Sequence, residues 1–119
     1  MENCHYWDPI FRRKFFDLNN RLKTVDEEEM YKDMLSNLSP KYRDPILRLY
    51  SANPFDISLN YYPKLLVAQT WSYVRDSEDG IDLFKSQLDD MIASGGYCSQ
   101  GWSNRMIQIL FALNILNLD

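Results

Sequence analysis

The sequence predicts an all-α fold: a compact single-domain bundle of five or six helices, spanning residues 1–119, around a central, apolar C-terminal helix. Apolar residues recur at intervals of three and four over most of the chain, which is the spacing of one helix face. Residues typical of helix caps, several followed by proline, precede these segments. Only four glycines and five prolines are present, too few for the turns of a sandwich or barrel of many short strands.

The first two predicted helices form a hairpin. Residues 8–9 are Asp-Pro, an N-cap followed by proline at the first helical position, and apolar residues at helical spacing continue to about residue 23. Residues 24–27, Thr-Val-Asp-Glu, fit a capping box with Thr24 as the N-cap. A second helix is therefore expected from there to about Asn37. Residues 1–7 are expected to form a flexible N-terminal tail.

Two more cap-and-proline pairs occur in the middle of the chain. Ser39-Pro40 is expected to open a single turn, and Asp44-Pro45 to start a helix over residues 45–52. Proline at position 54 then breaks the chain into a loop, because the residue before a proline avoids the α region. The next helix is expected over residues 62–75. Alternating apolar residues leave a short strand over residues 57–62 as an alternative.

The last two predicted helices cover residues 80–93 and 102–116. They are joined by a tight loop over residues 95–101, where glycines favour the end of one helix and the start of the next. The final helix is apolar on nearly every face, so we expect its neighbours to surround it. Arg105 is a cation inside this apolar helix and requires a partner, for which Asp89 or Asp90 is suitable.

Charge and composition exclude several functional classes. The formal charge of −4 has the wrong sign for non-specific binding to phosphate backbones, so no direct contact with nucleic acid is expected. The longest apolar stretch, residues 106–116, is shorter than the roughly 20 residues of a membrane span. The N-terminal residues include acids and no apolar run, which does not match a signal peptide. The sequence thus predicts an intracellular protein without membrane association.

Catalytic and cofactor motifs are absent from the sequence. A single histidine, His5, and the lack of a Cys-x-x-Cys pair argue against the common zinc sites. No glycine-rich phosphate loop is present. We therefore expect no cofactor, no metal and no enzymatic activity. One enzyme hypothesis stays open: Cys98 precedes a helix, whose N-terminus would stabilise a thiolate, with His5 as the only imidazole base.

Residues 91–115 contain the pattern G-x-C-x-x-G-x-x-x-R, formed by Gly96, Cys98, Gly101 and Arg105. This segment resembles a helix-turn-helix segment in uncharacterised helical proteins of large DNA viruses. The resemblance implies a structural corner at these four residues and a viral context for the chain.

The first functional hypothesis is a non-enzymatic protein-protein interaction or structural protein, such as a virion component or a host-directed factor. Aromatic and acidic side chains are the candidate partner-binding residues: Trp7, Tyr61, Tyr62, Asp26, Glu27, Glu28 and Glu29. The partner is expected to be another protein, and a homo-oligomer is left open. The alternative is a small acidic inhibitor, an immunity or anti-defence protein that occludes a basic site on an enzyme. Its binding would weaken steeply with salt, unlike that of an apolar interface.

Overall fold

The computed structural model describes residues 17–50, 57–94 and 99–116, and it confirms the all-α, single-domain prediction. Residues 17–21 are helical, and no strand occurs within these ranges. The labelled helices that follow are α2 (Glu27–Asn37), α3 (Pro40–Tyr50), α4 (Ile57–Val74), α5 (Glu78–Ser94) and α6 (Ser99–Ala112). The predicted N-terminal tail and the first half of the predicted first helix lie outside the described residues.

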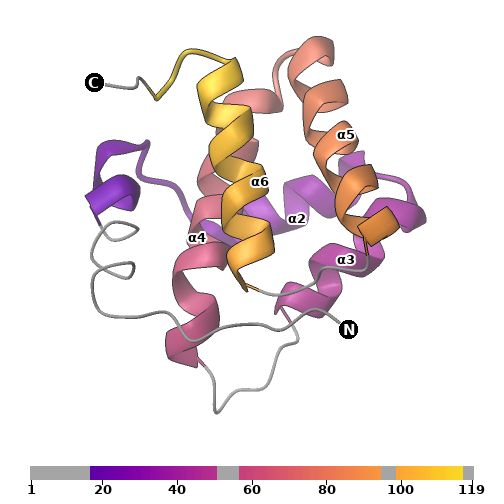
Figure 1. Cartoon of the computed structure of the whole chain (residues 1–119), viewed down its shortest axis with the longest axis horizontal. Coiled ribbons are helices and arrows are strands. Elements are labelled where there is room, and N and C mark those ends of the chain that lie inside the picture. The colour runs from indigo at the N-terminus through magenta and orange to yellow at the C-terminus, as the bar shows by residue number, and fades with distance from the viewer. Residues whose placement is uncertain (1–16, 51–56, 95–98, 117–119) are drawn as a thin grey trace.

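Helix α4 runs through the middle of the bundle. It packs against α2, α3, α5 and α6, and Figure 1 shows α6 lying along it, with α5 beside α6 and running in the opposite direction. Six successive residues of α4, Leu66 to Trp71, are buried, which requires neighbours on every side. The Trp71 ring meets Phe84 of α5 edge to face, with centroids 5.4 Å apart.

Helix α6 belongs to the core as the sequence predicts, through Trp102, Met106, Ile109 and Leu110, which are fully buried. It is less enclosed than expected, because Gln108 and others on its outer side are exposed. The central position predicted for the C-terminal helix is therefore shared with α4, which the other labelled helices surround.

The start of α2 differs from the sequence prediction. Asp26, and not Thr24, is the N-cap residue: its backbone is extended, and its Oδ1 accepts a hydrogen bond from the amide of Glu29 at 3.0 Å. A carboxylate at this position also interacts favourably with the positive end of the helix dipole, which a hydroxyl cannot match. The capping box at Thr24 is thus wrong, whereas the end of the helix at Asn37 is confirmed.

Helix α3 is continuous, although the sequence predicts one turn and then a separate helix from Pro45. The amides of Tyr42 and Arg43 donate to the carbonyl of Ser39 at 2.9 and 3.1 Å, so the helix begins there and passes through Pro45. Proline has no N–H, so the helix lacks one internal hydrogen bond at this position. Burial of Pro45 and of Ile46 offsets that loss.

Helix α4 begins at Ile57, so residues 57–62 form neither the end of the predicted loop nor the alternative strand. The part of that loop before residue 57 lies outside the described residues. The helix continues through Pro63, which the sequence analysis assigns to its first turn. One missing hydrogen bond is tolerated in a helix of 18 residues in which residues 66–71 are all buried. The end of α4 at Val74 agrees with the predicted end near Arg75.

Helix α6 ends at Ala112, four residues before the predicted end. Asn114 has a φ of 59°, and the amide of Asn114 donates to the carbonyl of Phe111 at 3.0 Å. The amide of Ile115 donates to the carbonyl of Leu110 at 2.9 Å. This pair of hydrogen bonds is a Schellman motif, in which asparagine takes the left-handed position more often filled by glycine.

The connection between α4 and α5 is tight. Ser77 caps α5: its Oγ accepts from the Gly80 amide at 3.2 Å, and its carbonyl accepts from the Ile81 amide at 2.9 Å. The helix therefore starts two residues earlier than predicted. A Cβ atom on Gly80 would lie 3.0 Å from both Cα and the carbonyl oxygen of Val74. Glycine therefore fits this close approach of the two backbones, whereas a larger residue would force the Val74 backbone to shift.

We expect Gly80→Ala to destabilise the protein, although alanine in place of a helical glycine is usually favourable by about 1 kcal/mol. The added methyl group must displace the Val74 backbone, which costs about 1–3 kcal/mol. Urea denaturation measures the change, with Ser86→Ala at an exposed position of the same helix as the control. A Gly80→Ala protein as stable as wild type would contradict the close approach.

Candidate functional site

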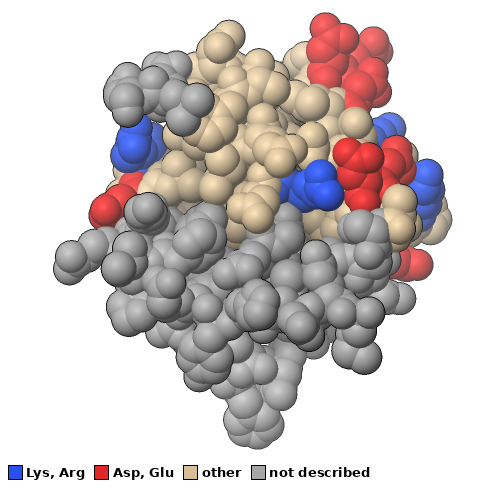
Figure 2. All heavy atoms as spheres, in the orientation of Figure 1, with Lys and Arg blue, Asp and Glu red and all other residues tan. Residues whose placement is uncertain are grey.

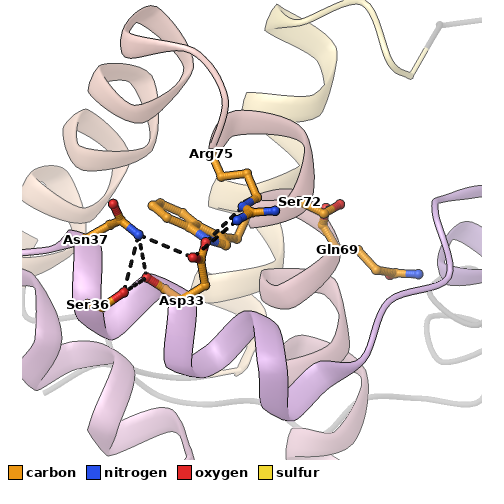
Figure 3. A network of polar contacts seen from close by, with 7 residues as sticks. Asp33, Ser36, Asn37, Gln69, Ser72 and Arg75 are labelled. Carbon is orange, nitrogen blue, oxygen red and sulfur yellow. Dashed lines mark hydrogen bonds and ion pairs between the residues drawn. The ribbon is translucent and has the colours of Figure 1, made fainter.

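A polar cluster joins α2 to α4 (Figure 3). Asp33 Oδ2 accepts hydrogen bonds from Trp71 Nε1 at 2.6 Å and from Arg75 Nε at 2.9 Å. Its Oδ1 lies 3.3 Å from Arg75 Nη2 and 3.4 Å from Asn37 Nδ2. Trp71 is fully buried, and the Asp33 side chain is 22% exposed.

This cluster is suited to holding two helices together rather than to chemistry. Both oxygens of Asp33 already accept hydrogen bonds from the protein, so neither is directed at a substrate proton. The buried indole N–H of Trp71 needs an acceptor, and Asp33 provides it. No motif in the sequence links positions 33, 71 and 75, so this cluster is visible only in the folded protein.

A second cluster joins α3 to α5. Asp89 Oδ1 lies 2.9 Å from Lys41 Nζ, and Asp89 Oδ2 accepts from the Tyr42 hydroxyl at 3.2 Å. The amino group of Lys85 lies 5.9 Å from the centre of the Tyr42 ring. The hydrogen bond from Lys41 lowers the pKa of Asp89, and the same bond raises the pKa of Lys41. The charged pair therefore contributes to packing between α3 and α5.

We expect Asp89→Asn to weaken the dependence of stability on acid pH. Because the folded pKa of Asp89 lies below its ordinary value of 3.8, the ion pair stabilises the native state above that value and is lost as the pH falls through the folded pKa. The effect is small, since the Lys41 and Asp89 side chains are 61% and 44% exposed to solvent. Urea denaturation at about pH 6 and about pH 2 measures the free energy of unfolding of both proteins. The difference between wild type and variant should be smaller at the acid pH. An equal difference at both pH values would contradict this assignment.

The acidic residues proposed for partner binding form the start of α2. Asp26 serves as the N-cap, and Glu28 pairs with Lys32 at 3.4 Å. Both members of that pair are more than 70% exposed, so the pair contributes little to stability. Glu29 is exposed.

Glu27 is only partly exposed. Burial raises the pKa of Glu27, and the charge of Lys64 opposes that shift. Cations of α2 and α4 thus offset part of the negative charge at the start of α2, and this block is not a purely acidic surface.

Arg105 has the kind of partner that the sequence predicts. Its Nη1 lies 3.8 Å from Asp90 Oδ2 and 3.4 Å from Gln87 Oε1, both in α5. Asp89, the other candidate, pairs with Lys41 instead. The Arg105 side chain is 29% exposed, so this contact lies at the surface where α5 meets α6.

Several predicted site residues lie outside the described part of the chain: Trp7, Gly96 and Cys98, together with His5. At three others only the helical backbone is described: Tyr61 and Tyr62 in α4, and Gly101 in α6. The structural corner and the Cys98 hypothesis therefore stay predictions. Within the described ranges, no group of three or more His, Cys, Asp or Glu residues could hold a metal ion. No helix among them is long and apolar enough to cross a membrane.

The outer face of α6 is the surface feature that the sequence analysis missed. We define it by three exposed residues, Asn104, Gln108 and Ala112, and the partly buried Ile107 and Phe111. Arg105 is the single charged residue in the 14 residues of α6, and it is paired. In Figure 2 the surface at the upper part of α6 is uncharged.

The exposed positions of the neighbouring helices differ from this face. They include Glu28 and Lys32 in α2 and Asp82 and Asp90 in α5, as is usual for helices that face water. Acidic side chains border the uncharged surface on its α5 side in Figure 2. The α6 face is thus an uncharged strip beside an acidic edge.

No protein-family model matches the chain, and neither the curated proteins nor the solved structures include a significant match to it.

Proposed function

We propose that this chain is a non-enzymatic protein-binding domain and that the outer face of α6 is its binding surface. The observation that carries the proposal is the lack of unpaired charge along that face, while the exposed positions of α2 and α5 carry many charges. The centres of protein interfaces are depleted of charged residues, whereas solvated helix faces are rich in them. Ile107 and Phe111 add apolar area that a partner would bury.

The two alternative functions have less support. An acidic inhibitor that acts through the start of α2 would present uncompensated carboxylates there, but Lys32 and Lys64 offset part of that charge. The polar clusters at Asp33 and Asp89 use their carboxylates to join helices. The Cys98 hypothesis depends on the sequence alone, because Cys98 and His5 both lie outside the described residues. The resemblance of residues 91–115 to viral proteins adds the expectation that the partner is a virion or host protein.

Affinity capture from the native source tests the proposal, with three forms of the chain compared by quantitative mass spectrometry. Gln108→Arg places a charge at the centre of the α6 face, and Thr24→Arg places the same charge at an exposed position before α2. We expect wild type and Thr24→Arg to capture the same amount of the partner. Gln108→Arg should recover at least about tenfold less of it, because a desolvated, unpaired charge opposes binding.

Equal recovery by all three proteins would show that the α6 face is not the binding surface. Recovery of the wild-type chain only as an unbound monomer would contradict protein binding altogether. Neutralising Glu28 and Glu29 tests the acidic inhibitor, because only that function predicts a loss of binding when charge is removed from the start of α2.

A further inference from the structure

We propose that the occupant of the α6 face is an amphipathic helix of another protein that carries lysine or arginine along one edge. This inference rests on the proposed function, and it adds the chemistry of the partner. It follows from the charges that border the face, because an interface combines an uncharged centre with a rim whose charges complement those of the partner.

The rim lies on the side of α5 that borders α6. Asp79, Leu83, Gln87 and Asp90 follow at spacings of four, four and three residues, which places them on one side of the helix. Gln87 and Asp90 both reach Arg105 of α6, so this side of α5 adjoins the α6 face. Leu83 between them is partly buried.

Carboxylates therefore lie toward both ends of this edge. Asp79 and Asp90 are both exposed and are separated by 11 positions, or about 16 Å along the helix axis. Asp82 and Glu78 add negative charge near the Asp79 end, where Figure 2 shows acidic side chains gathered. Arg105 offsets only part of the negative charge of Asp90, because the contact of 3.8 Å is long and the Asp90 side chain stays 62% exposed.

The geometry of this edge sets the pattern of the partner helix. A helix lying along α6 would place residues at i, i+4, i+7 and i+11 beside the acidic edge. Basic side chains at those positions would span the distance from Asp79 to Asp90. Its adjoining face would carry leucine, alanine and similar residues that cover Ile107, Gln108 and Ala112 without introducing charge.

Two synthetic peptides of identical composition test this pattern by fluorescence anisotropy. Both are helical and about 18 residues long, with a leucine and alanine face. In the first, four lysines follow one edge of that face at the spacing given above; in the second, they lie on the opposite, solvent-facing side. We expect the first peptide to bind the full-length protein about tenfold more tightly than the second, because only its lysines approach the acidic edge.

Matched variants separate a docked helix from general attraction to an acidic protein. Asp79→Asn should weaken binding of the first peptide several-fold, while Asp44→Asn removes the same charge from an exposed position of α3 and should leave binding unchanged. Gln108→Arg should weaken binding of both peptides by at least tenfold. Circular dichroism and urea denaturation confirm that each variant folds.

Equal binding of the two peptides, or equal loss from Asp79→Asn and Asp44→Asn, would overturn the proposed partner chemistry. The same variants distinguish this outcome from a failure of the proposed function. If Gln108→Arg abolishes capture of the native partner while the two peptides bind alike, the α6 face binds protein but not a basic-edged helix. If Gln108→Arg reduced neither capture of the native partner nor binding of the peptides, the α6 face would not be the binding surface.

Discussion

Leu110→Asp is expected to unfold the protein. Leu110 is fully buried in α6, among the side chains of the common core. Aspartate would place a charge there without a partner, a cost of several kcal/mol even after the structure relaxes, in addition to the lost apolar contacts. Since small domains are stable by about 5–15 kcal/mol, the native state would lose most or all of its population.

Circular dichroism and size-exclusion chromatography at neutral pH measure this effect. Gln108→Asp is the control, because it adds the same carboxylate two positions away at an exposed site and should remain folded. A Leu110→Asp protein with wild-type helicity and a cooperative urea transition would contradict the placement of α6 in the core.

Asp33→Ala is expected to lower the free energy of unfolding by about 2 kcal/mol. The substitution removes the only acceptor that the structure shows for Trp71 Nε1 in the described residues, and an unsatisfied buried donor costs about 1–3 kcal/mol. The ion pair with Arg75 adds less, because the Arg75 side chain is 41% exposed.

Two further variants separate these contributions in urea denaturation. Asp33→Asn keeps an oxygen for Trp71 Nε1 and should lose less stability than Asp33→Ala. Arg75→Met removes only the exposed ion-pair partner and should cost well under half as much. If Arg75→Met were the more damaging change, Asp33 would act mainly through the ion pair and not as the acceptor for Trp71.

The sequence predicts the helices well where periodicity and capping agree. Asn37 at the end of α2 and Val74 at the end of α4 are close to their predicted positions. The main errors occur at Pro45 and Pro63, because proline after an Asp or Tyr resembles a helix start when only local sequence is considered. In the folded protein, burial of neighbouring residues such as Ile46 and Leu66 compensates for one missing hydrogen bond.

The candidate site is harder to predict than the helices. The sequence shows that Arg105 needs a carboxylate, and Asp90 is one of the two proposed. It does not show that one side of α6 reaches the surface, because a nearly continuous apolar pattern does not indicate which side of the helix faces solvent. The acidic edge beside α6 likewise depends on how α5 is rotated, which only the tertiary contacts of Gln87 and Asp90 reveal.

Carboxylates serve two different purposes in this protein. Asp33 and Asp89 lie between helices and accept hydrogen bonds from side chains of other helices. Asp79 and Asp82 are exposed on α5 and join no helices within the described ranges. Substitutions in the first group should therefore affect stability, and substitutions in the second should affect binding with little change in stability.

Hydrogen-deuterium exchange on the complex captured from the native source tests the central claim, that the α6 face binds a protein, most directly. Compared with the free chain, the complex should show slower exchange in peptides that cover residues 104–115, together with the adjoining part of α5. The start of α2 should exchange at the same rate in both. Slower exchange confined to residues 26–37, with no change over α6, would contradict the claim and favour the acidic surface of α2 as the site of binding.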